Sequence, residues 1–240
     1  MRYFGIAFGQ GDFAYTCALE EERTSEPPVR LRCKFYEPGS VEDVAAAVRE
    51  AGDAAVVAIG APMSAPAEEG GETRACDVAL RRRGVVPLPY NESGRALFRA
   101  LSNRGIFEPR GLPGAAEGEV ADGAFREAPV VETHPDGVFC ALQGKRMPAK
   151  RHPLGVRRRI EELEEDQLID ADGDFWYRRI EEIDAAAAAL AAHRYAVAHA
   201  CWVGDPAEGV IVLPGSRLPE SFSGEGVIPP VARSPLRGSG

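Results

Sequence analysis

The sequence predicts an α/β domain with a central mixed sheet, in which a three-stranded antiparallel meander precedes parallel strands and helices flank the sheet. Three observations predict it. Apolar segments with strand composition lie at residues 3–8, 13–19 and 29–36. A capped helix and a continuously apolar segment at residues 54–59 follow, as in a crossover to a strand buried on both faces. A long Ala-rich helix, residues 180–202, has small side chains that allow close approach to a sheet.

The first half of the chain supports each of these elements in order. Residues 9–12, Gly-Gln-Gly-Asp, form a tight hairpin signal between the first two strands. Ser40 is a suitable N-cap with Asp43 three residues later, so a helix is expected from there to about residue 51. Gly60 and the proline two residues later end the buried strand abruptly.

The second half is predicted to be mostly helical, with two more strands. Helices are expected at residues 73–83, 92–103, 136–142, 154–165 and 180–202, and strands at 128–133 and 209–213. Residues 65–71 and 111–123 have loop composition, and residues 166–174 form an acidic linker. Residues 1–214 therefore form one domain, and residues 215–240, rich in Pro, Gly, Ser and Arg, form a loosely ordered C-terminal tail.

Composition narrows the functional classes. The chain of 240 residues has a formal net charge of -9, which is unusual for a phosphate-binding protein, although a local basic patch can override the total. Five scattered cysteines without CxxC spacing indicate free thiols in a reducing compartment. No apolar run has the length of a membrane span, and no signal-peptide pattern opens the chain, so a cytoplasmic protein is expected.

Asp184 is a charged residue on the apolar face of the long helix. At 100° per residue it falls on the same stripe as Ile180, Ala188 and Tyr195. An unpaired carboxylate buried there costs several kcal/mol, so Asp184 needs a metal, a cation or hydrogen-bond donors. A partly hydrated Asp that accepts from backbone amides is the alternative.

The order of elements is that of a ribonuclease H-like α/β fold, and short motifs along residues 3–214 agree with one family. They are Tyr-Phe-Gly-Ile-Ala at residue 3, Val-Val-Ala-Ile-Gly-Ala-Pro at 56, Arg-Ala-Cys-Asp at 74, Val-Glu-Thr-His-Pro at 131, Ile-Asp-Ala at 183 and Val-Gly at 203. The chain resembles the domain of unknown function 429 family (DUF429), predicted ribonuclease H-like nucleases.

The resemblance implies a divalent-metal-dependent phosphodiester hydrolase with Mg²⁺ or Mn²⁺ as cofactor. In two-metal cleavage the ions lie about 3.5–4 Å apart and prefer carboxylate oxygens. The family's glutamate before His-Pro matches Glu132, and its helix aspartate matches Asp184, so these two are the expected catalytic and metal-binding residues. The family usually has aspartates where this chain has Ala7 and Gly60, which supply no side-chain oxygen.

These departures predict a degenerate metal site with weak or no phosphodiesterase activity. Asp77 is a further candidate ligand, with an ion pair to Arg81 as its alternative. Glu132 has its own alternative, pairing with an arginine or capping the next helix. His134 is expected to be a structural turn histidine or a ligand.

A basic run at residues 145–159 is the candidate nucleic-acid contact. It contains seven basic residues and no acidic one, and the candidate contacts are Lys150, Arg151, Arg157 and Arg158. Arg157 and Arg158 also stand four residues before Glu161 and Glu162, which suits intrahelical ion pairs. The alternative function is therefore a noncatalytic domain that binds a nucleic acid or a protein.

Overall fold

A computed structural model describes residues 1–9, 13–22, 29–64, 73–109 and 117–224. The strands are β1 (Arg2–Phe8), β2 (Ala14–Glu22), β3 (Arg30–Phe35), β4 (Val56–Gly60), β5 (Gly118–Glu119), β6 (Val130–Glu132), β7 (Leu168–Asp170), β8 (Ala200–Asp205) and β9 (Gly209–Pro214). The helices are α1 (Val41–Glu50), α2 (Ala75–Arg82), α3 (Glu92–Leu101), α4 (Ala124–Glu127), α5 (Pro135–Gln143), α6 (Pro153–Glu165) and α7 (Ile180–Ala196), with single turns η1 (Ser102–Arg104) and η2 (Phe175–Tyr177). The tip of the predicted hairpin, residues 10–12, and the predicted loop at 65–71 lie outside the described residues.

The main sheet has six strands in the order β6-β4-β1-β2-β3-β7. Strands β1, β2 and β3 form the predicted antiparallel meander, and β4 and β6 add in parallel beside β1. The predicted α/β architecture with a mixed central sheet flanked by helices is confirmed. Because β1 is a central strand, its carboxyl end meets those of β4 and β6 at one edge.

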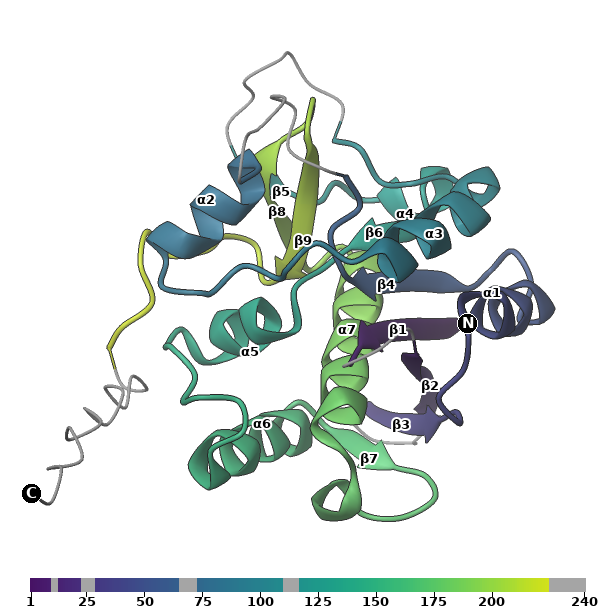
Figure 1. The fold of residues 1–240 in the computed structure, drawn as a ribbon, viewed down its shortest axis with the longest axis horizontal. Helices are drawn as coiled ribbons and strands as arrows, with labels where there is room; N and C mark the ends of the chain where they lie inside the picture. The colour runs from purple at the N-terminus through teal and green to yellow at the C-terminus, as the bar shows by residue number, and fades with distance from the viewer. Residues whose placement is uncertain (10–12, 23–28, 65–72, 110–116, 225–240) are drawn as a thin grey trace, which may run out of the picture.

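Helices flank this sheet (Figure 1), and its two faces bury separate layers of the core. On one face α1 and α3 cover Phe4, Ile6 and Ile59. On the other face α7 lies directly over β1. A Cβ added to Gly5 would lie 2.1 Å from the carbonyl oxygen of Ala185 and 2.0 Å from the amide nitrogen of Ala189. Only glycine permits this contact, so α7 and β1 meet backbone to backbone.

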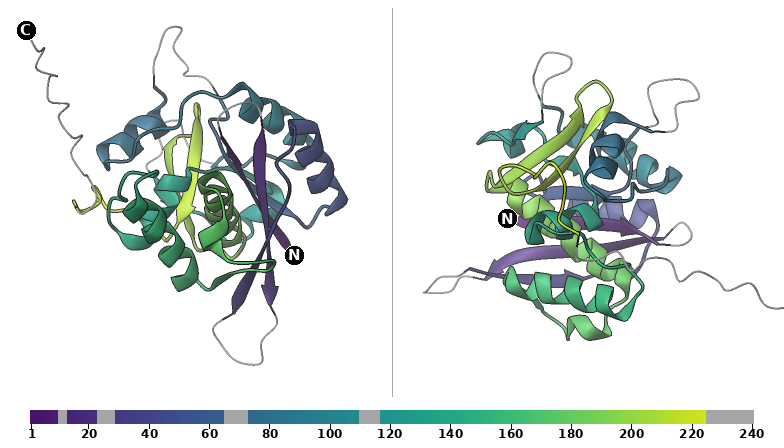
Figure 2. Two further views of the ribbon diagram at one scale, coloured as in Figure 1. Left: turned by 60° about the horizontal axis from the view of Figure 1, so that its bottom comes forward. Right: turned by 90° about the vertical axis from the view of Figure 1, so that its left-hand side faces the viewer.

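A second sheet, β5-β8-β9, packs on the far side of α7. The left view of Figure 2 shows α7 between this small sheet and the six-stranded sheet. The sequence predicts helix as far as residue 202, but α7 ends at Ala196 and residues 200–205 form β8. Ala198 turns the chain with a φ of 53°, a left-handed conformation with no Gly to signal it. The predicted acidic linker likewise contains strand β7.

Part of the predicted tail belongs to the domain. Leu218 and Phe222 are buried in the core, and the amide of Phe222 donates to the carbonyl of Arg83 at 3.3 Å. The domain therefore continues past residue 214 to at least residue 222, because both apolar side chains belong to the main hydrophobic core. Residues 225–240 of the predicted tail lie outside the described residues.

Candidate functional site

The carboxyl ends of three parallel strands bring the family positions to one edge of the sheet. Ala7 is paired with Gly60, and Ile59 is paired with Glu132. Ligand sites of α/β sheets lie at the carboxyl ends of parallel strands. The sequence therefore places its candidate residues where the fold favours a site.

Gly60 has little room for a longer side chain. A Cβ added there would lie 3.0 Å from Cγ of Pro135 and 3.1 Å from the carbonyl oxygen of Ile6. Ala7 is itself buried between β4 and β2. Neither residue offers a side-chain oxygen, and the Pro135 ring occupies the space beside Gly60.

Glu132 is held by an arginine. Both its carboxylate oxygens accept from Arg74, at 2.8 Å from Nη1 and 2.6 Å from Nη2. The amide of Met63 donates a third hydrogen bond at 2.8 Å. Arg74 also binds Asp77, with Nε 3.0 Å from one oxygen and Nη2 3.2 Å from the other. Arg74, Asp77 and Glu132, here called the Glu132 cluster, are all buried.

Burial and pairing act against each other in this cluster. Loss of water raises the pKa of Glu132, and the two bonds from Arg74 and the Met63 amide counter that rise. Burial acts to lower the pKa of Arg74, but its bonds to Glu132 and Asp77 outweigh burial and raise it. A bidentate Arg–carboxylate pair has good geometry for both partners. The cluster is therefore a closed unit, in which each charged group is paired with another member of the cluster.

Asp184 lies in the first turns of α7, beside the end of β1. The neighbouring Glu181 approaches Gly9, whose added Cβ would lie 3.1 Å from its Cγ, and Ala185 contacts Gly5. The side chain of Asp184 is only 5% exposed, so the predicted buried carboxylate is confirmed. Its partner is the ammonium group of Lys150, which binds Oδ2.

Three further features describe this second group, here called the Asp184 cluster. Asp136 accepts from Arg159 at 2.8 Å, and its charge acts on Asp184. Burial raises the pKa of Asp184 to about 7; Lys150 opposes the rise and Asp136 adds to it. Oδ1 of Asp184 has no hydrogen-bond partner among the described residues. The cluster, Asp136, Lys150, Arg159 and Asp184, is therefore incompletely satisfied.

Glu132 and Asp184 lie on opposite faces of the sheet. Side chains alternate along a strand, and Glu132 is in register with Ile59, whose side chain faces α1 and α3. Asp184 belongs to α7, which covers the other face at Gly5. The two carboxylates therefore share an edge of the sheet, but each binds its own cation and they share no polar partner among the described residues.

The other candidates have structural partners. Asp77 pairs with Arg74 rather than with Arg81. His134 caps α5, since its Nδ1 accepts from the amide of Gly137 at 3.0 Å while Nε2 lies 2.9 Å from the carbonyl oxygen of Val86. This is the structural turn histidine that the sequence predicts. Across the residues that the structure covers, no group of three or more His, Cys, Asp or Glu side chains is arranged to hold a metal ion.

Most basic side chains of the run at residues 145–159 form ion pairs with carboxylates. Lys150 binds Asp184, which places this predicted nucleic-acid contact in the Asp184 cluster instead. Arg157 binds Glu161 at 2.6 Å, as the intrahelical alternative predicts, whereas Arg158 binds Glu161 at 3.2 Å and not the Glu162 four residues on. Arg151 lies 3.5 Å from Glu181. Of these four, Arg151, Arg157 and Arg158 are exposed.

Sequence reasoning missed Arg74 and Lys150 as the partners of the buried carboxylates, and it missed Asp136 as a second carboxylate whose charge acts on Asp184. Arg74 is 58 residues from Glu132, so no local pattern connects them. The composition contains one signal that could have identified Lys150. Lysine occurs only three times among 28 basic residues, so a lysine inside an arginine-rich run is unusual in this chain.

Comparisons with known proteins agree with the motifs. Residues 23–208 match the family described as Protein of unknown function (DUF429), and the chain belongs to this family. Searches of curated proteins and of solved structures give no significant match. Among the described residues, no helix is long and apolar enough to cross a bilayer.

Proposed function

We propose that this protein is a ribonuclease H-like member of its family with a degenerate divalent-metal site and weak or no phosphodiesterase activity. The strand order β3-β2-β1-β4-β6, with β2 antiparallel and the others parallel, supports the fold assignment. The bidentate pair between Arg74 and Glu132 is the observation that carries the functional proposal.

A hard divalent ion needs carboxylate oxygens that are free to coordinate it. Both oxygens of Glu132 already accept from a guanidinium group, and a positive charge at that position repels a metal ion. Asp184 retains one unpartnered oxygen but is paired with Lys150. Because Ala7 and Gly60 add no oxygen, the residues at this edge do not fit a two-metal site.

The test combines metal binding with cleavage. Mg²⁺ and Mn²⁺ are titrated into the protein by calorimetry, and fluorescent single-stranded RNA, single-stranded DNA and an RNA–DNA hybrid are assayed with each ion. We expect no stoichiometric metal binding, and any trace cleavage should be the same in wild type, Asp184→Asn and Glu132→Gln. Stoichiometric metal binding together with rapid metal-dependent cleavage that either substitution abolishes would overturn the proposal.

The noncatalytic alternative, a nucleic-acid contact through residues 145–159, has weaker support. A phosphate group would have to displace Glu161 from Arg157 and Arg158, and Glu181 from Arg151. Fluorescence anisotropy of a labelled oligonucleotide at low salt tests it. Binding that weakens with salt and is lost in the Arg157→Gln/Arg158→Gln double variant would favour this alternative.

We also propose a cytoplasmic location. All five cysteines are free and buried, which suits a reducing compartment. Secretion of the native protein with disulfide bonds would contradict this part of the proposal.

A further inference from the structure

A cavity of about 850 Å³ lies at the amino ends of the parallel strands β4 and β6, at the edge of the main sheet opposite the two carboxylate clusters. It is bordered by the end of α1 and the turn that enters β4, by η1, and by the segment that runs from α4 into β6. The start of β1, marked N in Figure 1, lies at the same edge. The volume is in the range of small-molecule pockets in proteins. None of the described residues that line it belongs to either cluster, so the cavity is a separate candidate site.

The charged groups that line this cavity are mostly basic. They are Arg49, Arg104 and Arg126, with Asp53 as the one carboxylate among the described lining residues. The whole chain has 37 acidic and 28 basic residues, so this local excess of positive charge runs against the composition. A hollow lined by one sign of charge attracts ions of the opposite sign and raises their local concentration. The cavity therefore favours an anion.

Arg104 is the fixed member of this group. Its side chain is only 7% exposed, and Nη2 donates to the carbonyl oxygens of Gly52 at 3.0 Å and Ala55 at 2.9 Å. Nε has no hydrogen-bond partner among the described residues. The carboxylate paired with the guanidinium group, Asp53, lies 4.0 Å from Nη1 and is fully exposed, and such a pair contributes little in water. The two carbonyls orient the guanidinium group without neutralising it.

The other two arginines can turn toward a ligand. Arg49 and Arg126 are exposed, and neither side chain makes an ion pair or a hydrogen bond with another described residue. Arg126 lies against the ring of Phe125, with its guanidinium carbon 5.8 Å from the ring centre. Phe125, Val56 and Pro129 also line the cavity, so an apolar surface adjoins the guanidinium groups. Guanidinium groups bind phosphate oxygens through pairs of parallel N–H bonds, which suits a phosphate group beside an apolar body.

We propose that this cavity binds the phosphate group of a small molecule, either inorganic phosphate or a phosphate monoester. The phosphate group lies between Arg104 and the two exposed arginines, and the organic body of a monoester lies against Phe125 and Pro129. A doubly charged phosphate replaces the distant, exposed Asp53 as the partner of Arg104 at little cost. The inference is independent of the proposed function, because the site lies at the other edge of the sheet and requires no metal ion.

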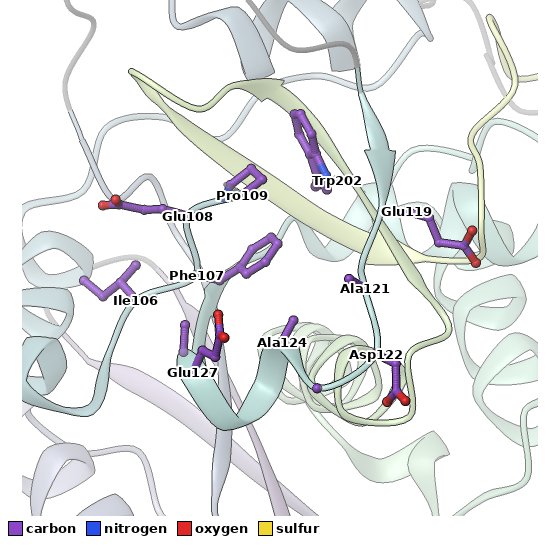
Figure 3. A pocket seen from close by; sticks show the side chains of 12 residues that line it. Ile106, Phe107, Glu108, Pro109, Glu119, Ala121, Asp122, Ala124, Glu127 and Trp202 are labelled. Carbon is purple, nitrogen blue, oxygen red and sulfur yellow. The ribbon is translucent and has the colours of Figure 1, made fainter. Parts of the chain in front are cut away.

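A second cavity, of about 550 Å³, provides a comparison within the same protein. Figure 3 shows the rings of Phe107, Pro109 and Trp202 around it, and the described residues that line it include no lysine, arginine or histidine. A phosphate group should therefore leave the indole N–H signal of Trp202 unchanged in NMR. The chain has two tryptophans, so Trp176→Phe identifies that signal.

An NMR titration at constant ionic strength tests the proposal, with EDTA present to exclude binding through a metal ion. The probes are phenyl phosphate, inorganic phosphate and phenol, which is the neutral analogue at pH 7. The reporters are the backbone amides of residues 52–56 and 103–105, which surround the guanidinium group of Arg104 and its carbonyl partners.

We expect phenyl phosphate to shift these amide signals with a dissociation constant at least about tenfold lower than that of phenol. Arg49→Gln and Arg126→Gln should each raise the dissociation constant of phenyl phosphate about threefold, and the double variant about tenfold. Arg104→Lys keeps the charge but loses the planar fork, and should raise it about fivefold. Arg82→Gln removes the same charge at an exposed position of α2, the helix packed beside β8, and is the matched control that should change nothing.

The two phosphate probes distinguish the source of the phosphate group. Tighter binding of phenyl phosphate than of inorganic phosphate identifies a monoester whose body contacts the apolar surface, whereas equal affinities identify the inorganic ion as sufficient.

Three outcomes would overturn the proposal. The first is no shift of the reporter amides by either phosphate probe at millimolar concentration. The second is equal binding of phenol and phenyl phosphate, which would show that the cavity does not select an anion. The third is equal binding to the Arg49→Gln/Arg126→Gln variant and to Arg82→Gln. These substitutions change exposed side chains, so unchanged amide signals in the rest of the protein show that each variant is folded.

Discussion

The Glu132 and Asp184 clusters each contain a buried carboxylate near the end of β1, but the two carboxylates are neutralised in different ways. Glu132 accepts three hydrogen bonds, two from a buried guanidinium and one from a backbone amide. Asp184 has a single lysine, whose side chain is 32% exposed, and keeps one oxygen without a partner among the described residues. The first carboxylate is fixed by geometry, whereas the second can exchange its charge for a proton.

This difference has an energetic meaning. A buried ion pair repays the loss of hydration only when its geometry is good and its remaining hydrogen-bonding groups are satisfied. The Glu132 cluster meets both conditions, so removing Arg74 leaves Glu132 and Asp77 without the cation that they share. Asp184 has a pKa of about 7 because burial dominates, so near neutral pH it neutralises itself by binding a proton.

The largest effect is expected from Arg74→Met. It leaves Glu132 and Asp77 buried without a cation and should lower the free energy of unfolding by about 3–5 kcal/mol in urea denaturation. The double variant Arg74→Met/Glu132→Met should recover part of that loss, because Asp77 is then the one carboxylate of the cluster left without the guanidinium. A loss below about 1 kcal/mol in the single variant would show that the Glu132 cluster is not the closed unit described above.

The pH dependence of stability distinguishes the clusters next. Asp184 binds a proton in the folded state at pH values where the unfolded chain does not, so wild type should lose stability as the pH rises from 5.5 to 7. The contribution levels off only about one unit above the pKa of Asp184, near pH 8. The loss between pH 5.5 and 8 is about 2 kcal/mol, and Asp184→Asn should abolish it.

Thermal or urea denaturation at the two pH values measures this difference. Glu132→Gln provides the comparison within the same fold, since its carboxylate is held by Arg74. If Asp184→Asn retains the full pH dependence of wild type, another group is responsible and the comparison fails.

Lys150→Met should have a smaller effect, about 1 kcal/mol at pH 8 and less at pH 5.5. Its ammonium group is partly exposed, and Asp184 can take up a proton when the cation is lost. Lys34→Met, at an exposed lysine of β3, is the control for loss of a surface charge. A loss of unfolding free energy as large as that caused by Arg74→Met would show that the two clusters contribute equally to stability.

The smallest effect is expected at the exposed ion pairs of α6. Glu161→Gln removes the partner of both Arg157 and Arg158, whose side chains are exposed at the surface, where ion pairs contribute little. The unfolding midpoint should stay within the error of the measurement. A clear decrease would mean that these arginines are organised by Glu161 more than their exposure suggests.

Local sequence patterns account for most of the fold. The Ser40–Asp43 capping box, the buried strand Val56–Gly60 and the burial of Asp184 each follow from spacings of a few residues, and each is confirmed. The end of α7 could not be predicted in the same way. Alanine continues through residue 200, and the left-handed turn falls on Ala198, where no glycine or proline announces it.

The partners of the buried carboxylates could not be predicted, because they depend on contacts across the fold. Lys150 is 34 residues from Asp184, and Arg74 is 58 residues from Glu132. A pattern read along the chain identifies a carboxylate that needs neutralising. Several arginines and lysines are equally good candidates for its partner until the pairing of the strands is known. The alternative of an arginine partner for Glu132 is the one that the structure bears out.

The proline ring beside Gly60 decides where a side chain added at that position would have to be accommodated. A Cβ there would lie 3.0 Å from Cγ of Pro135 and 3.1 Å from the carbonyl oxygen of Ile6, contacts that a shift of a few tenths of an ångström relieves. Pro135 is the first residue of α5, and its φ is preset for the opening turn of that helix. A larger residue at position 60 is therefore expected to displace the start of α5 slightly, so the spacing between the end of β4 and the first turn of α5 is set by the absence of a side chain at Gly60.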